Sequence, residues 1–124
     1  MTAHAATSRY QKVQATTCSP VKLVSMLFDG AVRFANEAAD AIEKKDRARA
    51  GERIGRCHAV IEQLAASLDP NAAPDLCDDL MGIYAFCMRR LLEANIRQDR
   101  AALAEVVQVL TPLQEAWANL STRP

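Results

Sequence analysis

The chain has 124 residues, half of them hydrophobic and only 5% aromatic. This length suits a single domain that buries its core without metal or disulfide support. Fifteen Lys and Arg residues balance fifteen Asp and Glu residues, so the net charge at pH 7 is zero, which argues against binding to nucleic acid or recruitment to an anionic membrane.

The first 18 residues are mostly small or polar and show no helical apolar stripe; after Met1, the large apolar residues among them are Tyr10 and Val13. We predict an extended or mobile N-terminal arm over residues 1–18, followed by one domain over residues 19–124. Residues 1–8 lack the layout of a signal peptide, and no apolar run approaches the roughly 20 residues that span a bilayer. These features predict a cytoplasmic protein that does not insert into a membrane.

The first helix is predicted from Pro20 to about Lys45. Ser19 suits the capping position, and Pro20 suits the first helical position because it needs no hydrogen-bond partner for its nitrogen. Apolar residues recur at helical spacing in two adjacent stripes. The stripes are Leu23, Leu27, Ala31, Phe34, Ala38 and Ile42, and beside them Val24, Phe28 and Ala35.

Asp46 is predicted to cap a second helix that ends before Asp69. Its apolar stripe is Ile54, Cys57, Ile61, Leu64 and Leu68. Residues 69–74 contain two prolines and are predicted as the loop between two helical hairpins.

Pro74 is predicted to start a third helix, which is apolar on more than one face, like the first. Asp99 is predicted to cap a fourth helix. Pro112 is predicted to interrupt and kink this helix, because proline leaves the carbonyl of Gln108 without its helical partner. Short connections favour antiparallel neighbours, so the predicted fold is all-α, an antiparallel up-down four-helix bundle with an N-terminal arm.

The first and third helices carry more apolar residues than one neighbouring helix can cover. The excess residues are Val24, Met26, Phe28, Met81, Met88, Leu92 and Ile96. From the pattern alone, a core position and a position in a partner-binding groove remain open for them. The residues predicted as core without this ambiguity are Leu27, Ile61, Leu80, Leu91 and Leu110.

Three blocks in this order resemble the FliS-type flagellin export chaperone family. They are Thr-Cys-Ser-Pro-Val-Lys-Leu from Thr17, Met-Leu-Phe-Asp-Gly-Ala from Met26, and Met-Arg-Arg-Leu-Leu-Glu-Ala-Asn from Met88. Cys18, Val21 and Phe28 depart from the family's usual residues. The resemblance covers the chain from Tyr10 to Trp117.

The resemblance implies a chaperone that binds the disordered C-terminal segment of flagellin and prevents premature polymerisation before flagellar type III export. It favours a groove, and with it further contacts to an export-gate component or a co-chaperone, and a free state that is a monomer or weak homodimer. For the arm two alternatives remain open: it covers the groove until flagellin displaces it, or it is a disordered tail. The predicted partner-binding residues are Tyr10, Val13, Ser19, Pro20, Leu23, Val24, Met26, Phe28, Met81, Met88, Leu92 and Ile96.

The sequence shows no recognisable catalytic or cofactor-binding motif, so we predict neither an enzyme nor a bound cofactor or metal. His58 and Glu62 lie one helical turn apart, but a histidine at a helix edge is the simpler interpretation. The four cysteines lack metal-ligand spacing and are predicted to be reduced. The alternative function is a four-helix structural or regulatory module that self-associates through the same apolar stripes.

Overall fold

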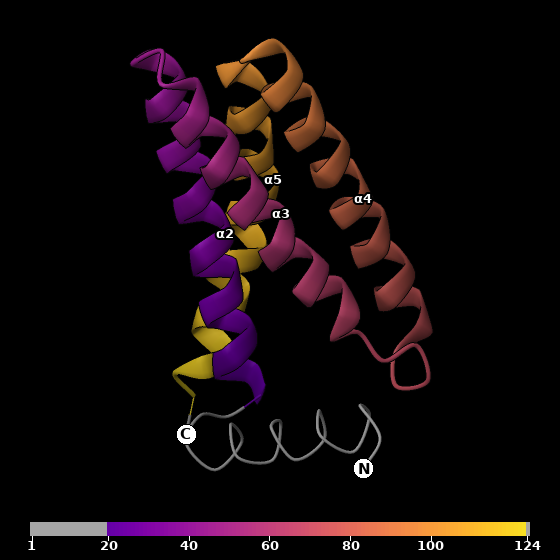
Figure 1. Cartoon of the computed structure of the whole chain (residues 1–124). Coiled ribbons are helices and arrows are strands. Elements are labelled where there is room, and N and C mark those ends of the chain that lie inside the picture. The colour runs from indigo at the N-terminus through magenta and orange to yellow at the C-terminus, as the bar shows by residue number, and fades with distance from the viewer. Residues whose placement is uncertain (1–19, 124) are drawn as a thin grey trace, which may run out of the picture.

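A computed structural model describes residues 20–123, and this part of the chain folds into four helices with no strand. The helices are α2 (Pro20–Glu43), α3 (Arg47–Ala66), α4 (Pro74–Arg97) and α5 (Arg100–Ser121). Successive helices run in opposite directions, and each packs against two neighbours, so that α2 lies between α3 and α5 while α4 closes the bundle (Figure 1). The predicted up-down four-helix bundle is confirmed.

Local sequence signals set the predicted helix starts. The Asp46 carboxylate accepts a hydrogen bond from the backbone N–H of Arg49 at 3.1 Å, and the Asp99 carboxylate accepts one from Ala101 at 2.9 Å. Each side chain satisfies a backbone donor that the first helical turn leaves free. Pro74 starts α4 as predicted.

The connections at one end of the bundle turn through left-handed backbone conformations. Lys45 has φ 59° and Gln98 has φ 51°, and these residues end α2 and α4 at the same end of the molecule. Because the backbone turns there, α2 ends at Glu43 rather than near Lys45 as predicted.

Phe28 joins three of the four helices through aromatic contacts. Its side chain is fully buried, and its ring centroid lies 5.4 Å from that of Trp117 on α5 and 6.5 Å from that of Tyr84 on α4. Tilted rings at these distances add to the apolar burial that holds the helices together. The other largest fully buried side chains are Tyr84, Ile61, Leu64, Leu91, Leu103, Leu110 and Val106.

Two buried cysteines pack at the centre of the bundle. The Cys57 thiol lies 3.3 Å from the carbonyl oxygen of Ala31, to which it donates. Burial raises the pKa of Cys57 to about 12 and the pKa of Cys87 to about 11, because an apolar core disfavours the thiolate. Both thiols, and that of Cys77, are free, as predicted for small core residues.

The helix α5 continues through Pro112 to Ser121, so the predicted interruption at this proline is wrong. Pro112 is exposed, and water can therefore reach the carbonyl that proline leaves without a helical partner. One residue earlier, the Thr111 hydroxyl donates to the Val107 carbonyl at 2.7 Å.

Candidate functional site

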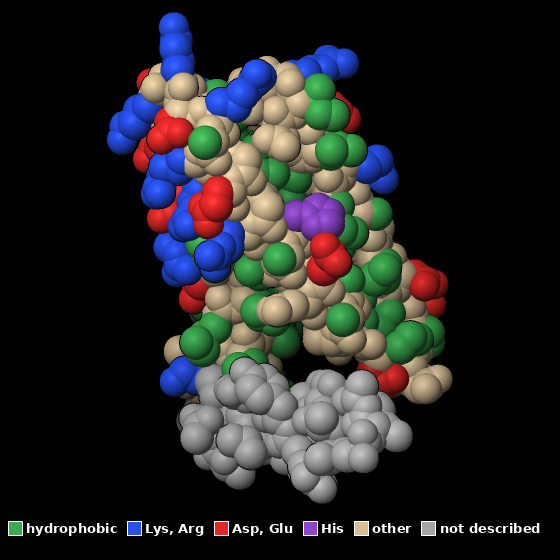
Figure 2. Space-filling view, viewed as in Figure 1, with side chains coloured by type: hydrophobic (Ala, Val, Ile, Leu, Met, Phe, Trp, Pro, Cys, Tyr) green, Lys and Arg blue, Asp and Glu red, His purple; other side chains and the backbone are tan. Residues whose placement is uncertain are grey.

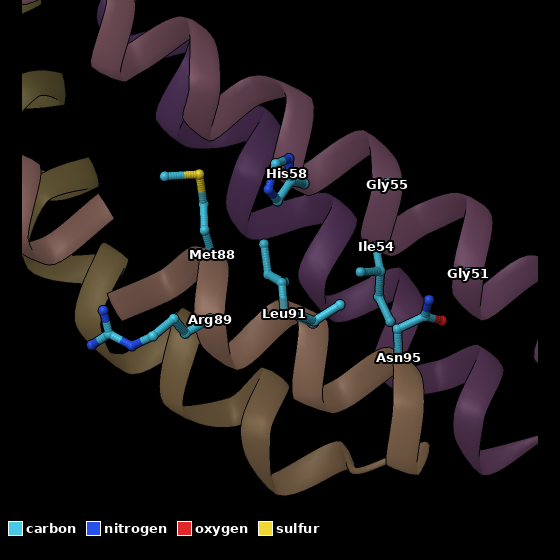
Figure 3. A pocket seen from close by; sticks show the side chains of 9 residues that line it. Gly51, Ile54, Gly55, His58, Met88, Arg89, Leu91 and Asn95 are labelled. Carbon is cyan, nitrogen blue, oxygen red and sulfur yellow. The ribbon is translucent and has the colours of Figure 1, made fainter. Parts of the chain in front are cut away.

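A cavity of about 500 Å³ opens between α3 and α4. Its lining comes from these two helices alone and consists of Gly51, Ile54, Gly55, His58, Met88, Arg89, Leu91, Leu92 and Asn95. Figure 3 shows Ile54 and His58 pointing from α3 towards α4, and Leu91 pointing from α4 towards α3. The guanidinium of Arg89 points away, so the cavity walls are mainly apolar.

The α3 side of the cavity has little side-chain volume, because it contains two glycines one helical turn apart. A Cβ atom built on Gly51 would lie 3.5 Å from the Asn95 side-chain oxygen, whereas one built on Gly55 would have nothing within 4 Å. At Gly55 the backbone of α3 is therefore open to the surface. We find no packing partner within the described chain that requires a glycine there.

The α4 wall continues beyond the cavity as a row of exposed apolar side chains. Met81 is 44% exposed, Leu92 60% and Ile96 65%, and Met88, between them along the helix, is half-buried. The row from Met81 to Ile96 is about 22 Å long at the helical rise. Soluble proteins seldom leave a continuous row of this kind uncovered unless it serves as a contact surface.

Polar groups flank this surface in small number. The Nδ1 atom of His58 lies 2.7 Å from the Glu62 carboxylate, at ion-pair distance. Asn95 closes the cavity against Gly51 at its other end. A partner with an apolar face and polar flanks suits such a lining.

The charges of the protein cancel in total but are distributed unevenly along α3 and α4. From Cys57 to Met88 the sequence has no Lys or Arg. We call the acidic residues of this stretch the acidic end: Glu62, Asp69, Asp75, Asp78 and Asp79.

At the opposite end of α3 and α4 lies a set of exposed cations, which we call the basic end: Lys44, Lys45, Arg47, Arg49 and Arg97. Within residues 20–123 none of these five forms an ion pair. Figure 2 shows many Lys and Arg side chains, with Asp and Glu among them, at the upper left of this face and only acidic charges at its lower right. The balanced composition had predicted no such field.

The structure divides the predicted partner-binding residues into separate groups. Tyr10, Val13 and Ser19 lie outside the described residues, as does the predicted arm over residues 1–18. On α4, Met88 and Leu92 line the cavity, and Met81 and Ile96 belong to the exposed row. The α2 group lines no part of this cavity: Pro20, Leu23, Val24, Met26 and Phe28.

Within the α2 group, Phe28 and Met26 differ strongly in the exposure of their side chains. Phe28 is fully buried and Met26 is 56% exposed. Phe28 therefore belongs to the core and not to a surface that a partner can contact in this structure, because Tyr84 and Trp117 cover its ring. Val24 also packs against the core, although it is only partly buried.

The sequence prediction included no α3 residue in the binding surface. Gly51, Gly55 and His58 carry little or no apolar side chain, so a search for excess apolar residues passes over them. The sequence feature that could have indicated the α3 side of the cavity was the pair Gly51 and Gly55, four residues apart inside a predicted helix, where glycine is unfavourable.

Among residues 20–123, no group of three His, Cys, Asp or Glu side chains is placed to hold a metal ion. None of the four described helices combines the length and the apolar character needed to cross a membrane. What the described site offers is contact surface.

The family model "Flagellar protein FliS" matches residues 2–124. The "Flagellar secretion chaperone FliS" of Bacillus subtilis (strain 168) is 34% identical over 108 residues, which are 87% of this chain and 80% of that protein. The protein of the same name from Salmonella typhimurium is also 34% identical over 108 residues, with 86% of this chain and 80% of that protein covered.

A solved structure described as "Crystal structure of flagellar chaperone from bacteria" has the same fold. The two structures align with a TM-score of 0.77 and 19% sequence identity, covering 94% of this chain and 95% of the other. At this identity the likeness supports the four-helix architecture, and the sequence relatives identify the family.

Proposed function

The chain belongs to the FliS family of flagellar proteins, and from that membership we propose that it is an export chaperone for flagellin. It binds the disordered C-terminal helical segment of flagellin in the cytoplasm, prevents premature polymerisation and delivers the client for flagellar type III export. The relatives' names as flagellar secretion chaperones support the class of function.

One observation supports the location of the binding site in this proposal. The exposed row Met81, Leu92 and Ile96 borders an apolar cavity between two helices. An amphipathic helix binds in such a groove by side chains that recur every three or four residues. The groove runs along α3 and α4, so it suits a helix that lies beside both.

Methionine contributes to this surface at two positions. Met81 and Met88 have unbranched, flexible side chains that adapt to irregular apolar partners. A chaperone holds its client without forming a final, tightly packed complex, and an adaptable wall serves that task better than a rigid one. Leu92, between Met88 and Ile96 on the same face, supplies apolar area of fixed shape.

Blocking polymerisation needs no chemical step in this mechanism. A client helix that lies in the groove cannot present the same apolar face to another flagellin. The client loses conformational entropy when it becomes ordered on binding, and this loss lowers the net affinity. An extensive contact surface is therefore compatible with later release. We therefore propose neither catalytic residues nor a bound cofactor.

Three finer parts of the proposal concern the arm, the loaded complex and the oligomeric state of the free protein. The arm, through Tyr10 and Val13, covers the groove in the absence of flagellin and lowers the apparent affinity for the client. The loaded chaperone presents a further surface to an export-gate component or a co-chaperone. Unloaded, the chain is a monomer or a weak homodimer.

Calorimetric titration with a peptide that covers the flagellin C-terminal segment of the same organism tests the function. We expect saturable one-to-one binding with a negative heat-capacity change, as burial of apolar surface produces. Absence of micromolar binding, by the full chain and by a chain that lacks residues 1–12, would contradict the proposal. A mass that rises with protein concentration without peptide would then support the self-associating module.

A further inference from the structure

Gly55 occupies a helix position at which glycine has no role inside the described chain. It lies within α3, far from both helix ends, where glycine is less favourable than alanine because its backbone loses more freedom on folding. A Cβ atom at this position would meet nothing within 4 Å. The packing of residues 20–123 therefore does not explain the glycine.

The chain's other three glycines provide the comparison. Gly30 is buried and a Cβ there would lie 4.0 Å from the Phe34 ring, and Gly51 faces Asn95 at 3.5 Å. Gly82 is as open as Gly55, but it does not line the cavity. Gly55 alone is both open and part of the cavity wall.

The walls opposite Gly55 are apolar and come from α4. Met88, Leu91 and Leu92 line the cavity across from it, and Figure 3 shows Gly55 on the α3 ribbon between Ile54 and His58. The cavity measures about 500 Å³, whereas about 150 Å³ suffices to hold a benzene ring. A large aliphatic side chain therefore fits beside the bare α3 backbone.

We propose that a large aliphatic side chain of the bound flagellin helix packs against the backbone of Gly55. We call this position on α3 the seat. This inference rests on the function proposed above. It identifies Gly55 as the position that determines how closely the client helix approaches α3. The side chain packs against the α3 backbone on one side and against Met88 and Leu92 on the other. A methyl group at position 55 occupies part of that space, and a larger group fills it.

The uneven charge distribution defines the occupant further. The groove leads from Gly51 and Asn95, near the basic end, where Glu43, Asp46 and Asp99 are interspersed with the cations, towards the acidic end. No Lys or Arg offsets the carboxylates between Cys57 and Met88. A helix with cationic residues at one end and acidic residues at the other is attracted in one direction and repelled in the reverse direction. The occupant is thus an amphipathic helix of this polarity, with its cationic end towards Asp78 and Asp79.

Matched substitutions at the two open glycines test the seat. Gly55→Ala, Gly55→Leu and Gly82→Leu are compared for thermal unfolding and for calorimetric binding of the flagellin C-terminal peptide. Each variant should raise Tm by a few degrees, because each replaces an exposed helical glycine with a better helix former. Gly55→Ala should weaken binding several-fold and Gly55→Leu about thirtyfold or more, whereas Gly82→Leu should retain the wild-type Kd.

Wild-type affinity in a folded Gly55→Leu variant would overturn the seat and leave the chaperone function standing, since the unmodified chain would still bind the peptide. Loss of affinity in both Leu variants would also overturn it, because the effect would not be local to the cavity. If the unmodified chain binds no peptide, the proposed function fails first. If it dimerises and Gly55→Leu abolishes the dimer, the occupant is a second copy of this chain.

Discussion

The rings of Phe28 and Trp117 lie 5.4 Å apart between centroids and connect the first half of α2 to the last turns of α5. This contact lies beyond Pro112, whose nitrogen cannot donate a helical hydrogen bond to the Gln108 carbonyl. The aromatic contact therefore holds the end of α5 on the bundle through side chains.

Replacement of Phe28 by alanine should destabilise the bundle strongly. The ring is fully buried and contacts two other aromatic rings, and removal of a buried Phe side chain costs about 3–5 kcal/mol. Urea unfolding followed by circular dichroism measures the loss. Phe28→Leu, which keeps most of the apolar volume, should lose much less, and Trp117 fluorescence should shift towards that of an exposed indole only in the alanine variant.

Stability should fall as the pH rises above about 9. Burial raises the pKa of Cys57 from 9.0 to about 12 and that of Cys87 from 9.0 to about 11. The unfolded chain therefore releases these protons first, and each thiol should lower the free energy of unfolding by about 1.4 kcal/mol per pH unit between its two pKa values. Urea unfolding under reducing conditions from pH 7.5 to 10.5 measures this slope.

The thiols contribute nothing to the pH dependence below pH 8, because they are protonated in both states. A Cys57→Ala, Cys87→Ala double variant should show a shallower alkaline decline, whatever its stability at neutral pH. An equally steep decline in that variant would mean that other groups cause it.

Replacement of Leu92 by glutamate should weaken flagellin binding without unfolding the protein. The Leu92 side chain is 60% exposed, so the free protein tolerates the change, but a client helix would bury the charge. The loss of apolar burial and the desolvated carboxylate together should cost about 2 kcal/mol or more, which is about thirtyfold in Kd.

Leu76 offers the matched control for this substitution. It is a 51% exposed leucine on the same helix, and it does not line the α3–α4 cavity. Leu76→Glu should not weaken binding in the same titration, because its added carboxylate lies at the acidic end, where the cationic end of the client is proposed to bind. Equal losses in the two variants would show that α4 responds to charge in general and would contradict the assignment of the groove.

Deletion of residues 1–12 should raise the affinity for the flagellin peptide. If the arm covers the groove, its removal abolishes the competition and increases the fraction of binding-competent protein. The uncovered apolar surface should also lower solubility at high protein concentration. Unchanged affinity together with unchanged solubility would remove the arm from the mechanism.

Sequence alone was sufficient for the helix starts and the bundle topology. Asp46, Pro74 and Asp99 act through the adjacent backbone, so their roles are readable without knowledge of the fold. Pro112 shows the limit of such local rules. The packing of Trp117 and the exposure of Pro112 let α5 continue where a proline in an isolated helix would interrupt it.

The binding surface was only partly predictable because it depends on the packing of helices. Phe28 and Met26 are both apolar residues of the first helix, and only the position of α4 and α5 determines that Phe28 is covered. Leu92 and Met88 were predicted because they exceed what one neighbouring helix can bury, and the structure places both in the lining of the α3–α4 cavity. The role proposed for Gly55 depends on its lack of a side chain, which no count of apolar residues can detect.

The basic and acidic ends distribute the charge of this neutral protein unevenly along α3 and α4. At low ionic strength the ends of two free copies attract each other, so added salt should increase solubility by screening that head-to-tail attraction. A client helix bound with the opposite polarity compensates both ends at once. The loaded complex should therefore depend less on salt than the empty chaperone, and its formation should weaken the tendency of copies to align with one another.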